Sequence, residues 1–230
     1  HRFFEHLIVD RKLAGPTVSA VMTGLGVLIM RATALQPGPM GAAVSAIMGM
    51  ILTMTMVMIT SMAIVREREH GTLEQLIVTP LKPYELMLGK IIPYVFVGLI
   101  QATVALMVGI VVFDVPIRGS VVELFIYTLL FIVASLSLGM LISNFSKTQM
   151  QAMQMSFFIF LPSVLLSGFM FPREAMPEFF FQLGKVLPLT FYLQIMRGVV
   201  LKGVGIAALW PQVCSLIVFT SIVLTVRVKK

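Results

Sequence analysis

The run AAVSAIMGMILTMTMVMITSMAIV, residues 42–65, contains no charged side chain. A helix of roughly 20 mainly apolar residues crosses the hydrocarbon core of a bilayer, so this run is long enough to span it. The next stretch, REREHGTLEQLIVTPLKPYELMLGK at residues 66–90, is the most polar of the chain and contains two prolines. Its end overlaps a further apolar run, Tyr84–Phe113. The sequence therefore places a charged loop between two predicted membrane spans.

The composition of the chain is that of an integral membrane protein. Hydrophobic residues make up 58% of the 230 residues and charged residues only 12%, whereas soluble domains average roughly 45–50% and about 25%. The net charge of +7 comes from bases scattered between apolar runs. Anionic lipid and cytoplasmic loops account for them better than nucleic acid does. The single cysteine, Cys214, lies in an apolar run, which excludes a disulfide or zinc framework within one chain.

The apolar segments predict an all-α fold, a polytopic membrane bundle of about six transmembrane helices in one domain over residues 1–230. The predicted spans are Leu13–Met30, Ala42–Val65, Tyr84–Phe113, Val121–Ile142, Met150–Met170 and Trp210–Val226. Between the last two, Phe171–Gly205 is divided by prolines and glycines into pieces too short to span. Such pieces predict re-entrant or interfacial helices, which are tolerated at membrane depth only against protein or water.

The distribution of lysine and arginine predicts the orientation. With both termini in the cytoplasm, eleven of the 17 bases lie inside and six outside. Cytoplasmic loops carry an excess of these residues, so this orientation is favoured. It places the loop Arg66–Pro83 in the cytoplasm and the Phe171–Gly205 segment at the outer surface.

The cytoplasmic loop is predicted to contain a separate short helix. Gly71 is a natural stop for the preceding helix, and Thr72 followed by Gln75 forms a capping-box pattern that begins a new one. This helix runs over Leu73–Val78 and ends before Pro80, since the residue preceding a proline disfavours the helical conformation.

One face of that predicted helix is apolar, with Leu73, Leu76 and Ile77 at positions i, i+3 and i+4. A helix this short is not stable alone and needs a surface to pack on. Two interpretations are open: a solvated connection, or a docking element for the membrane domain or a partner. The capping box and the apolar face favour docking.

The pattern RERE-x-GTLEQL-x-VTPL-x-P-x-EL-x-LGK resembles the cytoplasmic loop of type-2 ABC exporter permeases, the membrane subunits of ATP-binding-cassette transporters. Further matching runs are Leu138–Ser143, Leu165–Pro172 and Leu187–Gly198. The resemblance covers about Ala46 to Arg227, so residues 46–227 are predicted to form the permease core. Residues 1–45, with the first predicted span, match poorly.

This resemblance implies that the loop helix is a coupling helix, which docks in a groove of a cytoplasmic ABC ATPase and transmits its closure. The residues predicted to contact the ATPase or transmit its movement are Glu67, Glu69, Gly71, Thr72, Leu73, Glu74, Gln75 and Leu76. The chain itself has no GxxxxGK[ST] motif, because Leu88-Gly89-Lys90 lacks the upstream glycine and the Ser/Thr. The resemblance thus implies a transport subunit, not an enzyme, with ATP and magnesium bound by the partner and no cofactor of its own.

The family resemblance also implies a second permease copy or a paralogue as partner, and a multi-pass location in the bacterial cytoplasmic (inner) membrane. Related efflux permeases usually carry a large extracytoplasmic domain between their first two spans. Only about Arg31–Gly41 fills that place here, and two explanations are open: a shortened form, or a damaged N-terminal part. Docking of a periplasmic adaptor, which such a domain would carry out, is left open.

Several residues within the spans are candidates for the translocation path. Methionines recur every four residues at Met50, Met54, Met58 and Met62. They either pack against neighbouring helices or form an adaptable lining, since methionine repacks easily. Two amides at membrane depth are costly unless paired or hydrated. The predicted path therefore comprises Met54, Met58, Gln101 and Gln154.

The Phe171–Gly205 segment is predicted to close the path from outside, with Gly168, Pro172 and Pro188 as the outer gate. Two other classes of protein fit the sequence less well. An intramembrane enzyme needs a base at depth, but His1, His6 and His70 lie outside the predicted spans. A secondary carrier or channel usually has charges within its helices or an inverted repeat, and the sequence shows neither. The substrate is left open.

Overall fold

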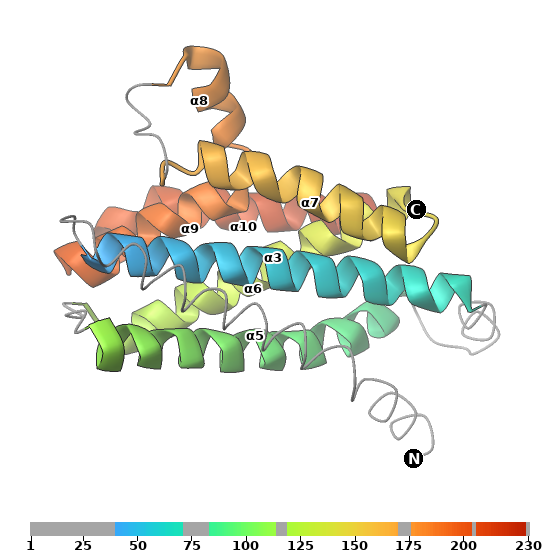
Figure 1. Ribbon diagram of the computed structural model, residues 1–230, viewed down its shortest axis with the longest axis horizontal. Helices are drawn as coiled ribbons and strands as arrows, with labels where there is room; N and C mark the ends of the chain where they lie inside the picture. The colour runs from blue at the N-terminus through green and yellow to red at the C-terminus, as the bar shows by residue number, and fades with distance from the viewer. Residues whose placement is uncertain (1–39, 71–82, 114–118, 170–175, 204–205, 229–230) are drawn as a thin grey trace.

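The computed structural model describes residues 40–70, 83–113, 119–169, 176–203 and 206–228. Within these ranges every regular element is a helix: α3 (Met40–Glu69), α5 (Pro83–Phe113), α6 (Val121–Phe145), α7 (Gln149–Leu166), α8 (Glu178–Gly184), α9 (Pro188–Arg197), the π-helix η3 (Gly198–Lys202) and α10 (Ile206–Val228). The long helices lie side by side (Figure 1). The predicted all-α polytopic bundle is confirmed.

The predicted spans agree with the helices to within a few residues, apart from Leu13–Met30, which lies outside the described residues. Four of the described helices are long and apolar enough to cross a membrane, namely α3, α5, α6 and α7. The bent pair α8 and α9 brings the number to five if it counts as one span. The apolar part of α10, Leu209–Thr225, is shorter. A total of six spans stays a prediction.

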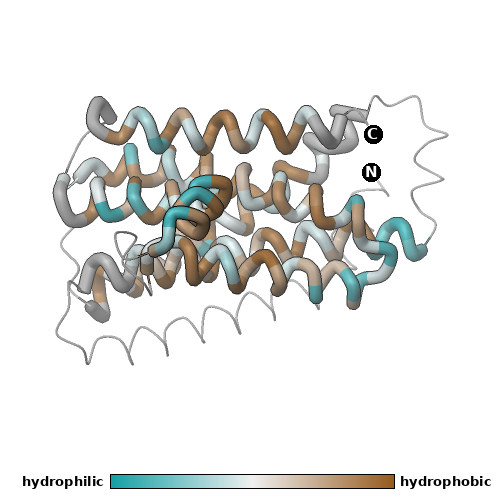
Figure 2. The backbone as a smooth tube through the Cα atoms, turned by 90° about the horizontal axis from the view of Figure 1, so that it is seen from above, coloured by the Kyte–Doolittle hydropathy of each residue, from teal (hydrophilic) through white to brown (hydrophobic). Residues whose placement is uncertain are grey.

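The helix α3 lies at the centre of the bundle. It packs against α5, α6, α7 and α9, and in Figure 1 it runs between α5 and α7. Its last turn, the start of α5 and the turn between α6 and α7 all lie at the right-hand end, which we call the polar end. Figure 2 shows hydrophilic residues at this end and on α8, while the long helices are mainly apolar. The opposite end, where α3 begins and α5 ends, is the far end.

Many of the hydroxyl groups inside the spans donate within their own helices, although those of Thr60 and Ser135 are buried with no partner among the described residues. Thr53 donates to the Gly49 carbonyl at 2.7 Å, Ser137 to that of Val133 at 2.8 Å and Ser156 to that of Ala152 at 2.7 Å. Each bond joins a side chain to the carbonyl one turn earlier, as is usual for Ser and Thr in helices. The sequence can therefore carry many Ser and Thr residues in its spans without exposing their donors to lipid.

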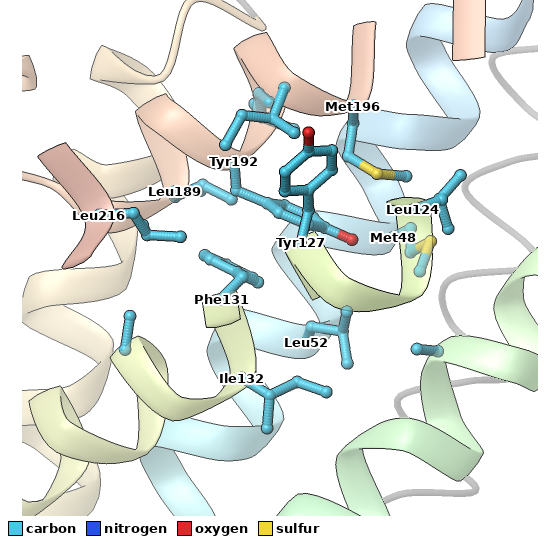
Figure 3. Packing of buried hydrophobic residues seen from close by; sticks show 14 of the residues in the cluster. Met48, Leu52, Leu124, Tyr127, Phe131, Ile132, Leu189, Tyr192, Met196 and Leu216 are labelled. Atoms are coloured by element: carbon cyan, nitrogen blue, oxygen red, sulfur yellow. The ribbon is translucent and has the colours of Figure 1, made fainter. Parts of the chain in front are cut away.

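An aromatic pair anchors α9 against α6. Phe131 and Tyr192 stack with ring centroids 4.0 Å apart and planes 8° from parallel (Figure 3). The Tyr192 hydroxyl lies 3.1 Å from that of Thr128, which itself donates to the Leu124 carbonyl at 2.8 Å. Both rings are fully buried. This short helix is therefore part of the core and not a surface loop.

The contact between α3 and α6 depends on Gly139. A Cβ atom at this position would lie 2.8 Å from the Val57 carbonyl oxygen and 2.9 Å from Cβ of Thr60. Small residues at helix interfaces allow such close approach of two backbones in a membrane. Because one of the atoms met is backbone, α3 and α6 must separate to admit even a methyl group.

We expect Gly139→Ala to lower the free energy of unfolding by about 1–3 kcal/mol, the usual cost of overpacking. The measurement is the thermal stability of the detergent-purified protein. Gly89→Ala is the matched control, because a Cβ atom there meets nothing within 4 Å. Its expected effect is neutral or slightly stabilising, since alanine has the higher helix propensity. Equal stability of the Gly139→Ala variant and the native chain would contradict the close packing.

Candidate functional site

One of the two predicted path amides is buried between helices. Gln101 of α5 is 5% exposed, and its Nε2 donates to Oγ1 of Thr55 on α3 at 2.9 Å. The Thr55 hydroxyl in turn donates to the Ile51 carbonyl. The Gln101 Oε1 atom is buried and has no hydrogen-bond partner among the described residues. The amide is therefore half satisfied, and it joins α5 to α3.

The other predicted amide points elsewhere. Gln154 lies on α7 and is exposed, while α7 and α5 flank α3 on different sides (Figure 1). Of the two methionines, Met58 is buried and Met54 half-buried on α3. Gln101 and Gln154 thus do not converge within one chain. The lining role of these four residues stays a prediction.

The far end carries the segment predicted as an outer gate. After α7, Gly168 adopts a φ of 84°, a left-handed conformation that glycine takes without steric cost. Its carbonyl accepts a hydrogen bond of 3.0 Å from Nη2 of Arg197, the last residue of α9. The Nε atom of Arg197 is buried with no partner among the described residues. One arginine therefore ties the end of α9 to the end of α7.

The helices α8 and α9 form a sharp bend of 84°, which agrees with the predicted broken, re-entrant segment. Pro188 is buried at the first turn of α9, where its missing N–H costs nothing. By contrast, α8 projects from the bundle (Figure 1), and its Phe179 is 72% exposed. Pro172, the third predicted gate residue, lies outside the described residues.

Two of the predicted coupling residues, Glu67 and Glu69, lie at the polar end. Gly71 to Leu76 lie outside the described residues, whereas Glu67 is half-buried and Glu69 exposed at the end of α3. The carboxylate of Glu69 accepts hydrogen bonds from the backbone N–H and the side-chain amide of Gln149, the first residue of α7. The predicted coupling residue Glu69 thus contacts another membrane helix.

Three residues of these contacts were not singled out from the sequence: Thr55, Gln149 and Arg197. Thr148 is the N-cap of α7 and accepts from the Gln151 N–H at 3.2 Å, so a capping signal at this turn was available. Nothing local pairs Arg197 with Gly168, 29 positions earlier. Among the residues that the structure describes, no three His, Cys, Asp or Glu side chains could hold a metal together. The predicted lack of a bound cofactor remains a prediction.

These features define a polytopic helical membrane protein with one polar end and a sharply bent helix pair at the other. Residues 32–227 match the family described as ABC-2 family transporter protein. The chain belongs to this family of ABC transporter permeases, and it is a multi-pass membrane protein. The predicted type-2 ABC permease is confirmed, and the match extends further towards the N-terminus than the predicted core of residues 46–227.

Individual relatives agree with the family. The chain is 33% identical over 178 residues to the probable multidrug ABC transporter permease YbhR of Escherichia coli K12, covering 77% of this chain and 48% of that protein. It is 34% identical over 154 residues to the probable multidrug ABC transporter permease YbhS, covering 66% and 41%. ABC transporter G family member 20 of Dictyostelium discoideum is 32% identical over 148 residues, covering 64% and 20%. The chain spans about half the length of YbhR.

We expect cysteines in α8 and α9 to react differently with a membrane-impermeant thiol reagent added from outside. In a Cys214→Ala background, Glu178→Cys and Phe179→Cys are labelled rapidly, because both positions are exposed. Thr190→Cys and Leu193→Cys are labelled slowly, since both are buried in α9. Labelling with reagent added to inverted vesicles is the control for sidedness. Equal labelling at all four positions would mean an ordinary exposed loop.

Proposed function

We propose that this chain is the membrane-spanning subunit of an ABC exporter, driven by a separate cytoplasmic ATPase that docks on the Thr72–Val78 segment. Membership in the ABC-2 family carries the proposal, since such permeases work with an ABC ATPase. In this proposal the chain lies in the bacterial inner membrane with both termini in the cytoplasm and moves its substrate outward. The ATPase binds ATP and magnesium.

The position of the proposed docking segment supports this function. It is preceded by α3, which ends at Glu69, and followed by α5, which begins at Pro83. Both of these points lie at the polar end (Figure 1), and α3 and α5 pack against each other. A partner that moves the segment therefore acts directly on two adjacent spans, one of which is the central helix of the bundle.

We expect Glu74→Arg and Leu76→Arg to abolish co-purification of the ATPase and its stimulation by the permease. A charge forced into a packed docking face costs several kcal/mol in desolvation, while the spans are untouched and should still fold. Glu178→Arg is the matched control, a charge reversal on the exposed helix α8, and it should leave co-purification unchanged. The measurement is the amount of ATPase retained and its activity at equal permease expression. Native levels in both variants would show that this segment is only a solvated connection.

The substrate and the outer gate belong to the same proposal. The relatives YbhR and YbhS are named as probable multidrug ABC transporter permeases, which supports drug molecules as substrates.

In the proposed cycle α8 and α9 close the path at the far end, with Gly168, Pro188 and Pro172 in the hinge regions. The bond from Arg197 to the Gly168 carbonyl supports the closed arrangement.

A second copy of the chain, or a paralogue, completes the proposed transporter. The exposed side chains of α5 between residues 91 and 111 are all apolar, as a lipid-facing surface should be. The exposed face of α7 includes Gln154 among apolar residues such as Met150 and Phe158. An amide facing lipid is costly. The α7 face, unlike that of α5, is therefore better suited to a partner subunit or the path between two subunits.

We expect a cysteine at position 154 to cross-link two copies of the chain in native membranes. Gln154→Cys in a Cys214→Ala background should give a dimer with a short bifunctional thiol reagent. Ile100→Cys is the control, because Ile100 is 64% exposed on the apolar face of α5, and it should stay monomeric under the same conditions. A dimer with Ile100→Cys and none with Gln154→Cys would place the subunit contact on α5 instead.

A further inference from the structure

The end of α3 holds the turn between α6 and α7 at the polar end. Oε1 of Glu69 accepts a hydrogen bond of 3.0 Å from the backbone N–H of Gln149, and Oε2 accepts from Nε2 of the same residue. The first N–H groups of a helix have no partner within the helix. The Thr148 hydroxyl accepts a hydrogen bond from the Gln151 N–H of α7. Glu69, from a different helix, accepts the one from the Gln149 N–H.

The residue before Glu69 makes the complementary contact. Nη1 of Arg68 donates to the carbonyl of Ser146 at 3.3 Å, and Ser146 is the C-cap of α6. Helix dipoles favour cations at C-terminal ends and anions at N-terminal ends. Arg68 lies at the C-terminal end of α6 and Glu69 at the N-terminal end of α7, so both charges match the dipole they face. We call Arg68, Glu69, Ser146 and Gln149 the α3 clamp.

The turn between α6 and α7 does not need the clamp to close. The Ser146 N–H bonds to the Ile142 carbonyl at 3.2 Å, and the Lys147 N–H bonds to Oε1 of Gln151 at 2.8 Å. The turn therefore forms through its own hydrogen bonds, and the bonds from α3 serve to connect it to α3. A second link, 2.9 Å between the hydroxyls of Ser61 and Ser156, joins α3 and α7 deeper in the bundle.

We propose that the α3 clamp makes α7 move together with α3 when the partner ATPase moves the 71–82 segment. This inference rests on the proposed function. Glu69 lies two positions before Gly71, so a displacement of the segment reaches the last turn of α3 first. The clamp then passes the displacement to the start of α7. The helix α7, about 27 Å long at 1.5 Å per residue, carries it to the far end.

At the far end, the structure connects α7 to the predicted gate. A Cβ atom at Gly184 of α8 would lie 3.0 Å from the Leu166 carbonyl, the last residue of α7. Arg197 of α9 bonds to the carbonyl of Gly168, two residues further. Glu69 and Gln149 are thus positioning residues in a route from the ATPase to α8 and α9. The loop predicted from the sequence acts directly on α3 and α5, whereas the clamp adds α7.

The test exchanges the two partners of the side-chain bond. Glu69→Gln removes the charge that faces the start of α7, and Gln149→Glu sets two carboxylates against each other. The double variant Glu69→Gln/Gln149→Glu restores an amide–carboxylate pair with donor and acceptor reversed. Exposed polar pairs add little to stability, so all three variants should fold with the native melting temperature.

The readout is the response of a single spin label to ATP and vanadate in the reconstituted permease–ATPase complex, in a Cys214→Ala background. One set carries the label at Phe179→Cys on α8, which is 72% exposed, and the other at Val111→Cys on α5, which is 74% exposed. We expect the α8 label to change its spectrum in the native chain, to lose this response in both single variants and to regain it in the double variant. The α5 label should respond in all four forms, because α5 follows the segment directly.

The matched control is Glu178→Gln, read with the α5 label and with a label at Val186→Cys, which lies exposed in the turn between α8 and α9. Glu178 is an exposed glutamate that also accepts from a glutamine amide, Nε2 of Gln182 at 2.7 Å, but it lies on α8. Both labels should respond as in the native chain. A retained α8 response in the Glu69→Gln variant, an absent α8 response in the native complex, or a double variant as unresponsive as the single ones would each overturn the clamp. If no ATPase co-purifies with the native chain, the proposed function itself is refuted.

Discussion

The hydrocarbon interior of the membrane leaves no water to bond the backbone, and every other feature of this fold follows from that constraint. Each N–H and C=O at membrane depth must find its partner within the protein, which favours continuous helices. Hydroxyl side chains obey the same constraint, as Thr53 and Ser156 show by bonding to carbonyls one turn earlier. Polar groups that cannot bond within their own helix must bond across helices. Among the described residues, several of those cross-helix bonds lie at positions with candidate functions, such as Gln101, Glu69 and Arg197.

The central position of α3 gives these bonds their arrangement. From its middle, Thr55 accepts from Gln101 of α5, and Ser61 lies 2.9 Å from the hydroxyl of Ser156 on α7. From its end, Arg68 and Glu69 reach the turn between α6 and α7. One helix thus makes side-chain hydrogen bonds to three neighbours at successive depths. A movement imposed on its end has several routes into the bundle.

The two ends of the molecule are built differently. At the polar end, charged side chains meet helix termini in contact with water, where such contacts are weak and easily exchanged. Towards the far end, Arg197 bonds to Gly168, and the aromatic pair Phe131 and Tyr192 is buried between α6 and α9. Buried polar contacts cost more to break than exposed ones. The far end therefore has the firmer contacts, which would suit the proposed outer gate.

Most of the fold was predictable because hydropathy and length are local properties. The apolar runs predicted α3, α5, α6, α7 and α10 to within a few residues, and the prolines and glycines of Phe171–Gly205 predicted the broken segment that became α8 and α9. The loop motif between two spans was sufficient to identify the family, which residues 32–227 confirm. These conclusions needed only the order of residues along the chain, since solvation by lipid acts on each segment separately.

What tertiary structure alone decided is which polar groups meet. The sequence treated Gln101 and Gln154 alike, as two amides at depth, but one is buried against Thr55 and the other is exposed on α7. It predicted Glu69 as a coupling residue, and only the structure shows that its carboxylate bonds to Gln149, 80 positions away. The helical repeat of the sequence shows which residues share a face. A helix that is apolar on all sides, however, does not show which face packs against which neighbouring helix. The rotation and the partners of each helix are set by close contacts such as Gly139 against Val57, which exist only once the bundle has assembled.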